Sequence, residues 1–421
     1  MTTAFHRVPW RFGASMYEVN IRQYTKEGTF EAFSKHLPRL KEMGVDVLWL
    51  MPVTPISEKI RQGTLGSYYA CSSYMEINPE FGDIHDFKNL VSDAHDAGMK
   101  IIIDWVANHT GWDHHWTAEH PEWFVTDDEG NFTERNGWHD VIDLDYTVPA
   151  VRTAMINALK FWVSACDIDG FRCDMAHLVP LDFWHEARTA CDELKPLLWL
   201  AECEVHEYHT VFDISYGWEW MHESEKLIKH VHDFSKLKNV MFNYLSYPDE
   251  AQKLLFTSNH DENSWNGTEY EKYGTAAKTF AVITCLWPGM PLVYSGQELP
   301  LVKRLKFFDK DEIEWTANIK LHEFYKLLLH LRKTHPVFEK GIDPVIIPAN
   351  NDKVFVYMLS NGAYKIMVLL NMSEENRVHI TLENELLPGS YFNLFSGLSH
   401  HFTSKEIFEL QAWEYLVYCS A

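Results

Sequence analysis

Short apolar runs that suit β-strands alternate with segments that suit amphipathic helices along most of the chain. In chain order the eight runs are SMYEVN, VDVLWL, KIIIDW, DIDGFRCD, LLWLAE, VFDIS, LLFTSN and PLVYSG. Each run is followed by enough chain for a helix, and one such helix face consists of Phe87, Leu90, Val91 and Ala94 at helical spacing. Eight strand–helix units predict an α/β fold of the (β/α)8 barrel type. An open doubly wound sheet is the alternative that the pattern permits.

Two regions depart from this alternation. After IIIDWVANH the chain runs for about forty residues, rich in Trp, His and Asp, which exceeds an ordinary βα loop and predicts a short excursion domain after the third strand. Towards the end, KVFVYMLS and AYKIMVLLN are joined across Asn361-Gly362, a strong hairpin signal that predicts an antiparallel β-domain. The predicted limits are 1–104 with 148–340 for the barrel, 105–147 for the excursion domain and 341–421 for a C-terminal β-sandwich domain.

Composition limits the classes of binding partner and the cellular compartment that we expect. The chain has 421 residues and a formal net charge of -23, which argues against nucleic acid or an anionic membrane as a partner and leaves neutral ligands open. Seven cysteines show no CxxC pair, and no apolar leader segment follows the first residues, so we expect free thiols and a cytoplasmic location. A protein exported with a trimmed leader would show the same sequence. No pattern indicates the oligomeric state.

Candidate catalytic groups stand where the predicted strands end. The third strand ends in Asp104, with Asn108-His109 beyond it, the fourth in Arg172 and Asp174, the fifth in Glu202, and the seventh in Asn259-His260-Asp261. In a barrel the carboxyl ends of the strands face the active-site mouth. The sequence therefore predicts at least three carboxylates converging at one rim.

The spacing of these groups suggests unequal proton affinities. Arg172 and Asp174 lie two positions apart and so on one side of a strand, where the arginine is expected to keep that carboxylate ionised. Glu202 follows an apolar run, so desolvation is expected to raise its pKa. Asp104 is expected to brace Arg172. One charged carboxylate and one that holds its proton suit cleavage of a glycosidic bond.

Several motifs, in order, resemble those of the α-amylase family, glycoside hydrolase family 13. The four main ones are DWVANH, GFRCDMAH, LAE ending at Glu202, and FTSNHD ending at Asp261. Supporting segments are GVDVLWLMP, YYACSSYMEINPEFGD, DLDY and GMPLVYSGQE. The resemblance spans about Met16 to Glu298, and it is the combination that is specific.

The resemblance implies a role for each matching residue. Asp174 would be the nucleophile, Glu202 the general acid/base and Asp261 the stabiliser of the transition state. The residues expected to contact the sugar at the scissile bond are His109, Arg172, His260 and Tyr69, the last by stacking, with Tyr68 as its rival. The family is retaining, which places the nucleophile and acid carboxyls about 5–5.5 Å apart.

The resemblance also raises the question of calcium. In many members of the family a calcium ion ties the excursion domain to the barrel, and the matching positions here are Asn108, Asp143 and the backbone carbonyl of His177. Oxygen ligands of this kind suit Ca²⁺. A further ligand from the excursion domain cannot be assigned, and NIRQYTKEGTF replaces the family's other calcium loop. The chemistry itself would need no cofactor.

The resemblance implies an enzyme acting on α-glucans such as starch or maltodextrins. A transglycosylase or an α-1,6-acting enzyme would use the same three carboxylates. A catalytically silent carbohydrate-binding barrel is the alternative from another class, although such proteins lose one or more of these carboxylates. A metal-dependent hydrolase with His109 and His260 as ligands is disfavoured, because HHW and HEYH lie in loops. His114 and His115 are expected to be solvated loop residues.

Overall fold

Eight parallel strands close into a barrel in the computed structural model, which describes residues 5–248, 250–339 and 342–420. The strands neighbour one another in the order β1-β10-β9-β8-β7-β6-β3-β2. Their bounds are β1 Met16–Val19, β2 Val47–Leu50, β3 Lys100–Trp105, β6 Gly170–Cys173, β7 Leu198–Ala201, β8 Ile214–Tyr216, β9 Gln252–Leu255 and β10 Met290–Tyr294. All eight apolar runs supply one of these strands, and the predicted fold class is confirmed.

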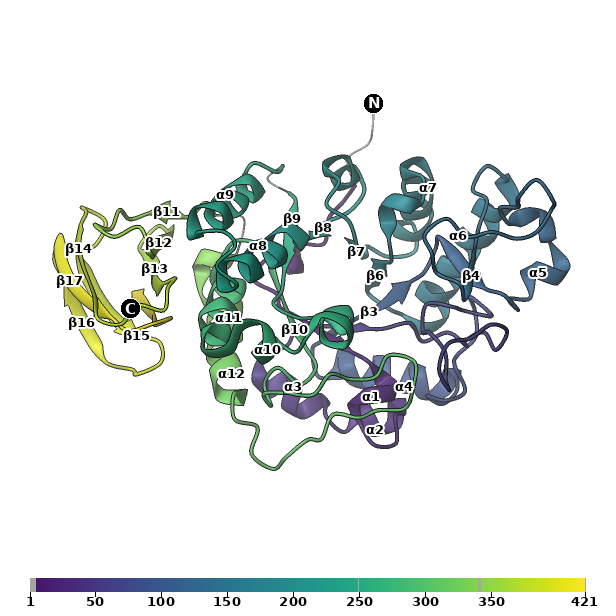
Figure 1. Ribbon diagram of the computed structural model, residues 1–421, viewed down its shortest axis with the longest axis horizontal. Helices are drawn as coiled ribbons and strands as arrows, with labels where there is room; N and C mark the ends of the chain where they lie inside the picture. Colours follow the sequence, from purple (N-terminus) through teal and green to yellow (C-terminus); the bar gives the residue numbers. More distant parts are fainter. Residues whose placement is uncertain (1–4, 249, 340–341, 421) are drawn as a thin grey trace.

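Helices follow the strands and surround the barrel (Figure 1). They are α1 Ile21–Tyr24, α2 Phe30–Ser34, α3 Leu37–Met43, α4 Ile84–Asp96, α5 Trp116–Glu119, α6 Pro149–Cys166, α7 Leu181–Asp192, α8 Trp218–Ile228, α9 Phe234–Leu245, α10 Glu269–Tyr273, α11 Ala277–Leu286 and α12 His322–Thr334. Helix α4 begins with a capping box between Asp83 and Asp86 and buries its predicted apolar face. In the described residues, no helix has both the length and the apolar character needed to cross a membrane.

The segment between β3 and α6 forms a small lobe on the right of Figure 1. Its antiparallel pair consists of β4 (His109–Gly111) and β5 (Val141–Asp143), with His109 opposite Asp143. The expectation of a solvated His114 is wrong. Its side chain is buried and packs on Tyr74 and Trp116, with ring centroids 5.0 and 4.7 Å away.

Antiparallel strands make up the C-terminal part of the chain, on the left of Figure 1. A six-stranded sheet has the order β11-β12-β13-β18-β15-β16, and β14 pairs with β17. The bounds are β11 Val345–Ile346, β12 Val354–Asn361, β13 Tyr364–Asn371, β14 Val378–Glu383, β15 Gly389–Asn393, β16 Ser399–Phe402, β17 Lys405–Leu410 and β18 Tyr415–Ser420. The expected hairpin joins β12 to β13, with Gly362 at a φ of 61° that favours glycine. The predicted boundary at residues 340 and 341 lies outside the described residues.

Strand β12 shows how this sheet attaches to the barrel. Side chains alternate between the two faces of a strand. Phe355, Tyr357 and Leu359 belong to the core shared with the barrel, whereas Val356 and Met358 belong to a second core between the two C-terminal sheets. The ring of Tyr357 lies 5.1 Å from that of Trp287, which follows α11. The sheet is therefore joined to the barrel by an apolar face.

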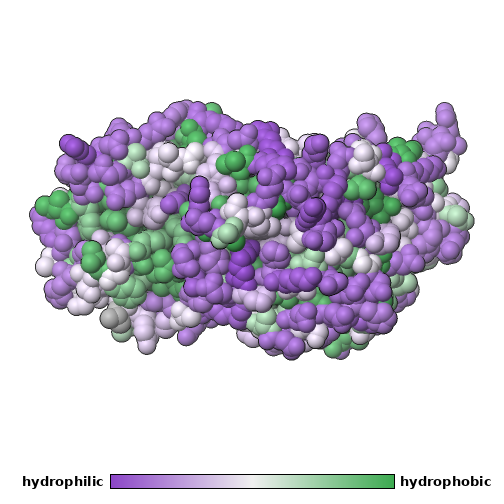
Figure 2. Space-filling view, turned by 90° about the horizontal axis from the view of Figure 1, so that it is seen from below, coloured by the Kyte–Doolittle hydropathy of each residue, from purple (hydrophilic) through white to green (hydrophobic). Residues whose placement is uncertain are grey.

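The surface reflects the acidic composition. Figure 2 shows a mainly hydrophilic face, with hydrophobic side chains gathered towards the end where the C-terminal sheets lie. Hydrophilic residues cover most of the rest, as expected for a chain with a formal net charge of -23. The interior contrasts with this, because all seven cysteines are buried and unpaired.

Candidate active site

The carboxyl ends of four barrel strands carry the polar side chains predicted to form the site. In chain order these are Asp104 in β3, Arg172 in β6, Asp174 after β6, Glu202 after β7, and His260 with Asp261 after β9. Glycine is required at position 170, where β6 begins, because a Cβ there would lie 2.1 Å from the carbonyl oxygen of Leu198 on β7. This close approach sets β6 and β7, and the side chains at their ends, side by side.

Arg172 is the centre of the charged cluster. One terminal nitrogen of its guanidinium lies 2.8 Å from Asp104 and 2.9 Å from Asp174. The other terminal nitrogen lies 2.9 Å from Glu202. The guanidinium is buried and packs at 5.0 Å over the ring of Trp49. One cation thus serves three buried carboxylates, which leaves an excess of negative charge at the barrel mouth.

This sharing changes the proton affinities. Burial and the nearby charge of Glu202 raise the pKa of Asp174 well above its usual value, and Arg172 only partly offsets them. The prediction that Arg172 holds the pKa of Asp174 low is wrong, because burial and the charge of Glu202 outweigh the effect of the arginine. Burial also raises the pKa of Glu202. The two carboxyl groups therefore titrate as a pair in two macroscopic steps.

The residue after Asp174 links the two carboxyl groups further. The backbone of Met175 has a φ of 40°, a left-handed conformation that is uncommon for a residue other than glycine. In this conformation its N–H donates a hydrogen bond of 2.8 Å to Glu202. The bond orients the Glu202 carboxylate towards the end of β6, where Asp174 lies.

Asp261 has a partner of its own. Its carboxylate lies 3.3 Å from Nε2 of His260, whose Nδ1 bonds to the buried Glu18 of β1. Burial opposes the charged form of His260, but the carboxylates of Asp261 and Glu18 outweigh it and raise the pKa of His260 well above its usual value. The resulting imidazolium holds the pKa of Asp261 below its usual value against the effect of burial. Asp261 therefore loses its proton more readily than Asp174 or Glu202, whose pKa values are raised.

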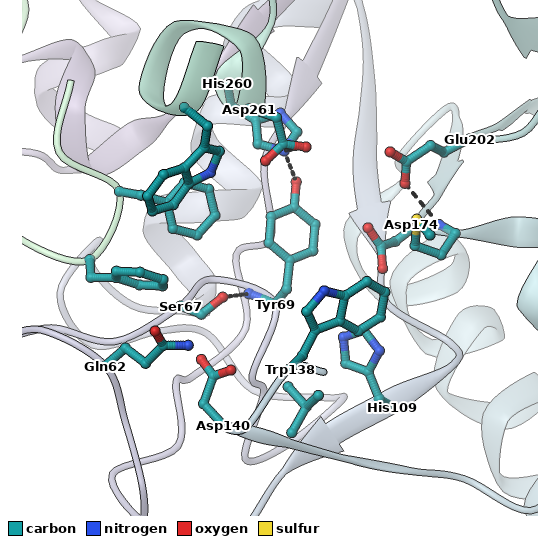
Figure 3. A pocket seen from close by; sticks show the side chains of 15 residues that line it. Gln62, Ser67, Tyr69, His109, Trp138, Asp140, Asp174, Glu202, His260 and Asp261 are labelled. Carbon is teal, nitrogen blue, oxygen red and sulfur yellow. Dashed lines mark hydrogen bonds and ion pairs between the residues drawn. The ribbon is translucent and has the colours of Figure 1, made fainter. Parts of the chain in front are cut away.

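Tyr69 lines the cavity and stands next to these groups (Figure 3). Its hydroxyl donates to Asp104 at 2.9 Å and lies 2.8 Å from Nε2 of His260. Its ring is nearly parallel to that of Phe307, with centroids 6.2 Å apart. The rival, Tyr68, is buried and is not among the residues that line the cavity.

His109 lines the opposite part of the cavity. It is buried, and burial lowers its pKa to about 4, so the imidazole is neutral near pH 7. The Asn108 side chain lies 3.1 Å from its Nδ1, which fixes the ring and leaves Nε2 to face a ligand. The ring of Trp138 meets it edge to face at 5.3 Å.

The cavity has a volume of about 320 Å³ and aromatic walls. Trp138 comes from the excursion lobe, Trp265 from the turn after Asp261, and Phe307 and Phe308 from the loop before α12. Sequence reasoning did not identify these four residues, because they lie in irregular segments. It also missed Glu18, although a charged residue inside the apolar run SMYEVN was a signal.

Of the three positions expected to bind calcium, Asp143 is already paired with a cation of the protein itself. Asp143 is fully buried, and one of its oxygens lies 2.6 Å from Nε of Arg135. Its other oxygen accepts a hydrogen bond of 3.3 Å from the amide nitrogen of Asn108. The carbonyl of His177 accepts a bond of 3.4 Å from the hydroxyl of Tyr208. The Asp143 carboxylate, the one charged ligand of the expected set, thus already has an arginine as its partner.

A second group of potential metal ligands lies elsewhere. Within the described residues, one set of three has ligand atoms close enough together, namely Glu42, His322 and Glu323. The ammonium group of Lys326 already pairs with Glu42, and both glutamates are exposed. None of the three lines the cavity, so they add nothing to its chemistry.

Known proteins resemble the chain over most of its length. The solved structure of a noncanonic maltogenic α-amylase, AmyB, from Thermotoga neapolitana shares 30% identity and a TM-score of 0.90, over 98% of this chain and 99% of that one. α-Amylase MalA of Haloarcula japonica is 26% identical over 87% of this chain. The α-1,4-glucan:maltose-1-phosphate maltosyltransferase of Picrophilus torridus is 26% identical over 83% of this chain. The chain spans 56% and 59% of the lengths of these last two.

The family described as "Alpha amylase, catalytic domain" matches residues 9–133 and 118–315. This match covers the barrel strands, the excursion lobe and all the residues of the charged cluster. The resemblance inferred from the motifs is thereby confirmed. The chain belongs to the α-amylase family, glycoside hydrolase family 13.

Proposed function

We propose that this protein is a retaining glycosidase that cleaves α-1,4 links in starch, maltodextrins or related oligosaccharides. Asp174 is the nucleophile, Glu202 the general acid/base, and Asp261 the carboxylate that stabilises the transition state. Family membership and the names of the relatives support the class of substrate. The retaining course and the individual roles rest on the site.

The observation that carries the proposal is the sharing of one guanidinium by two carboxyl groups. Asp174 and Glu202 bind different terminal nitrogens of Arg172, and both line the same cavity. The charge of Glu202 raises the pKa of Asp174, so the pair favours a state in which one carboxyl group holds a proton and the other is charged. The proposed roles place that proton on Glu202. A retaining glycosidase needs that division of protonation states.

The first chemical step uses both groups. An oxygen of Asp174 attacks the anomeric carbon of the bound glucosyl unit as the glycosidic bond breaks. The electron pair of that bond goes to the leaving oxygen, which takes the proton of Glu202. Glu202, now charged, then removes a proton from water, and the water oxygen displaces Asp174 from the anomeric carbon. The product keeps the α configuration.

Other residues of the cavity hold the sugar during these steps. Asp261, kept ionised by His260, places negative charge near the positive charge that develops on the sugar ring. Tyr69 presents its ring to the apolar face of the sugar. The neutral imidazole of His109 offers a hydrogen bond to a hydroxyl group without adding charge.

The proposal is tested with purified protein and maltoheptaose. Reducing sugar should be released, and proton NMR during the first minutes should show the α-anomer before mutarotation. The β-anomer as first product would exclude the retaining course, and failure to cleave maltoheptaose, starch, pullulan or cyclodextrins would exclude the function.

Glycosyl transfer is a second candidate. The similarity to a maltosyltransferase supports it, because the same carboxylates transfer a glucosyl unit when a sugar hydroxyl replaces water. The same incubation distinguishes the two activities. Products longer than maltoheptaose, with little reducing sugar released, would show transfer, whereas shorter products alone would show hydrolysis.

A further inference from the structure

Asp140, just before β5, is a buried carboxylate that has no partner. The residue is 4% exposed and lines the cavity. One of its oxygens is fully buried and makes no hydrogen bond. Among residues 5–248, 250–339 and 342–420, this oxygen, Oδ2, has no hydrogen-bond partner.

An unpaired buried carboxylate is costly, and this one contrasts with others in the same segment. Burial of a polar group without a hydrogen bond costs about 1–3 kcal/mol, and more when the group is charged. Asp143 is paired with Arg135, and Asp113 accepts the backbone N–H groups of Glu58 and Lys59. Asp140 thus keeps its acceptor capacity for something that enters the cavity.

The position of Asp140 indicates what enters. In Figure 3 it lies near Trp138 and Gln62, on the side of the cavity away from Glu202 and Asp261. A sugar attacked at its anomeric carbon must lie among the catalytic carboxylates. Asp140 therefore faces a neighbouring unit of a longer substrate rather than the unit that reacts.

We propose that Asp140 is a specificity-determining residue that accepts hydrogen bonds from a neighbouring glucosyl unit, beside the ring of Trp138. This inference rests on the proposed function. A sugar hydroxyl supplies an O–H donor, which matches the acceptor capacity of a carboxylate in the cavity wall. The indole ring offers an apolar surface to the C–H face of the same sugar.

A metal ion is a weaker explanation for Asp140. Calcium takes six to eight oxygen ligands, whereas the set of potential ligands found within the described residues lies on the surface and excludes Asp140. A neutral, hydroxyl-rich ligand needs no further charged partner. The chemistry of the cavity therefore favours a sugar.

The test compares wild type, Asp140→Asn, Asp140→Ala and the control Asp128→Asn. Asp128 is an exposed aspartate of the same segment and does not line the cavity, so the control removes one charge without touching it. For maltoheptaose we expect KM to rise about tenfold in Asp140→Asn and further in Asp140→Ala, since one charged hydrogen bond is worth about 1.5–3 kcal/mol. We expect kcat to stay within about twofold, because uniform binding is lost and not transition-state binding.

Binding is measured separately from turnover. In a Glu202→Gln background, calorimetric titration with maltoheptaose should give a Kd about tenfold weaker when Asp140→Asn is added. Saturating maltoheptaose should also raise the melting temperature less in the double variant. Without sugar, Asp140→Asn should fold and melt no lower than wild type, because it removes an unpaired buried charge.

The outcomes separate this inference from the function on which it rests. Unchanged KM and Kd, in a wild type that cleaves maltoheptaose, would overturn the role of Asp140 and indicate that water satisfies the carboxylate. A fall in kcat with constant KM would also overturn it, by placing Asp140 in the chemistry. A wild type that neither cleaves nor binds maltosaccharides would instead overturn the proposed function.

Discussion

The barrel mouth and the base of the excursion lobe each hold a contact between an arginine and a buried aspartate, but their charges balance differently. At the mouth, Arg172 serves Asp104, Asp174 and Glu202. In the lobe, Arg135 is the ion-pair partner of the buried Asp143. The first cluster has more carboxylates than cations, whereas the second is neutral.

This difference in charge balance suits the first cluster to catalysis and the second pair to holding the fold together. An excess of buried carboxylates makes proton binding responsive to small changes, which suits an acid and a nucleophile. A matched pair has fixed charges and connects two segments of backbone. The predictions below disturb one region or the other, from the largest expected effect to the smallest.

Removing the nucleophile should give the largest effect. Asp174→Asn keeps the shape but removes the attacking charge, so kcat for maltoheptaose should fall on the order of 10⁴-fold or more. Reducing-sugar release is the measurement, with circular dichroism as the check on folding. Activity within tenfold of wild type would contradict the role given to Asp174.

Glu18→Gln should alter the pH dependence of activity. The variant keeps an acceptor for His260 but removes a charge that raises the pKa of that imidazolium. Because the pKa of His260 falls, the imidazolium is lost at lower pH, and Asp261 loses its cation there. We expect the alkaline limb of kcat/KM to move to lower pH, with a loss of activity of about tenfold at its former position.

A profile of kcat/KM against pH from 4 to 10 distinguishes the outcomes for Glu18→Gln. A uniform loss of activity with unchanged limbs would indicate misfolding or a positional effect and would contradict the electrostatic role. A pH profile of the variant that matches that of wild type would show that Glu18 does not act through His260.

Breaking the matched pair should affect stability more than chemistry. Arg135→Gln leaves the buried Asp143 uncompensated, which should cost about 1–3 kcal/mol, less than a fully buried pair because the Arg135 side chain is 58% exposed. A melting temperature lower by a few degrees is expected in thermal unfolding. Arg304→Gln is the matched control, since its pair with Glu271 is exposed on both sides and should contribute little.

Added calcium chloride gives a second comparison, between the stability of Arg135→Gln and that of wild type. If Arg135 takes the place of a cation, calcium chloride should restore part of the lost stability in Arg135→Gln and none in wild type. Equal stabilisation of both proteins would contradict that interpretation.

Chelation should have the smallest effect. The melting temperature of wild type should change by less than about 1 °C with EDTA, because a ligand that does not bind the folded state does not stabilise it. A larger fall, reversed by calcium, would show that the site binds the metal despite Arg135.

The barrel strands and the C-terminal hairpin could be predicted from the sequence because each depends on a short, continuous stretch of residues. Strands buried on both faces appear as continuous apolar runs, and the polar residue that ends each run must face the mouth. Asp104, Asp174 and Glu202 were found in this way. The hairpin at Asn361-Gly362 was equally local.

What the sequence could not predict depends on contacts between distant segments. The pKa of Asp174 depends on how Arg172 is divided among residues from three strands. The pairing of Arg135 with Asp143, at a position expected to bind calcium, could not be predicted because Arg135 lies in an irregular segment with no periodic pattern. Asp140 was missed for the same reason, since only the folded cavity shows that its carboxylate lacks a partner.

Strand β12 has a consequence for any attempt to shorten this protein. Phe355 and Tyr357 pack against Trp287, whereas Val356 between them belongs to a separate apolar core. Cutting the chain before β12 would remove β12 with every later strand and expose the apolar face of the barrel against which the sheet packs. The two halves should consequently melt in one transition, and a truncated barrel should aggregate instead of working alone.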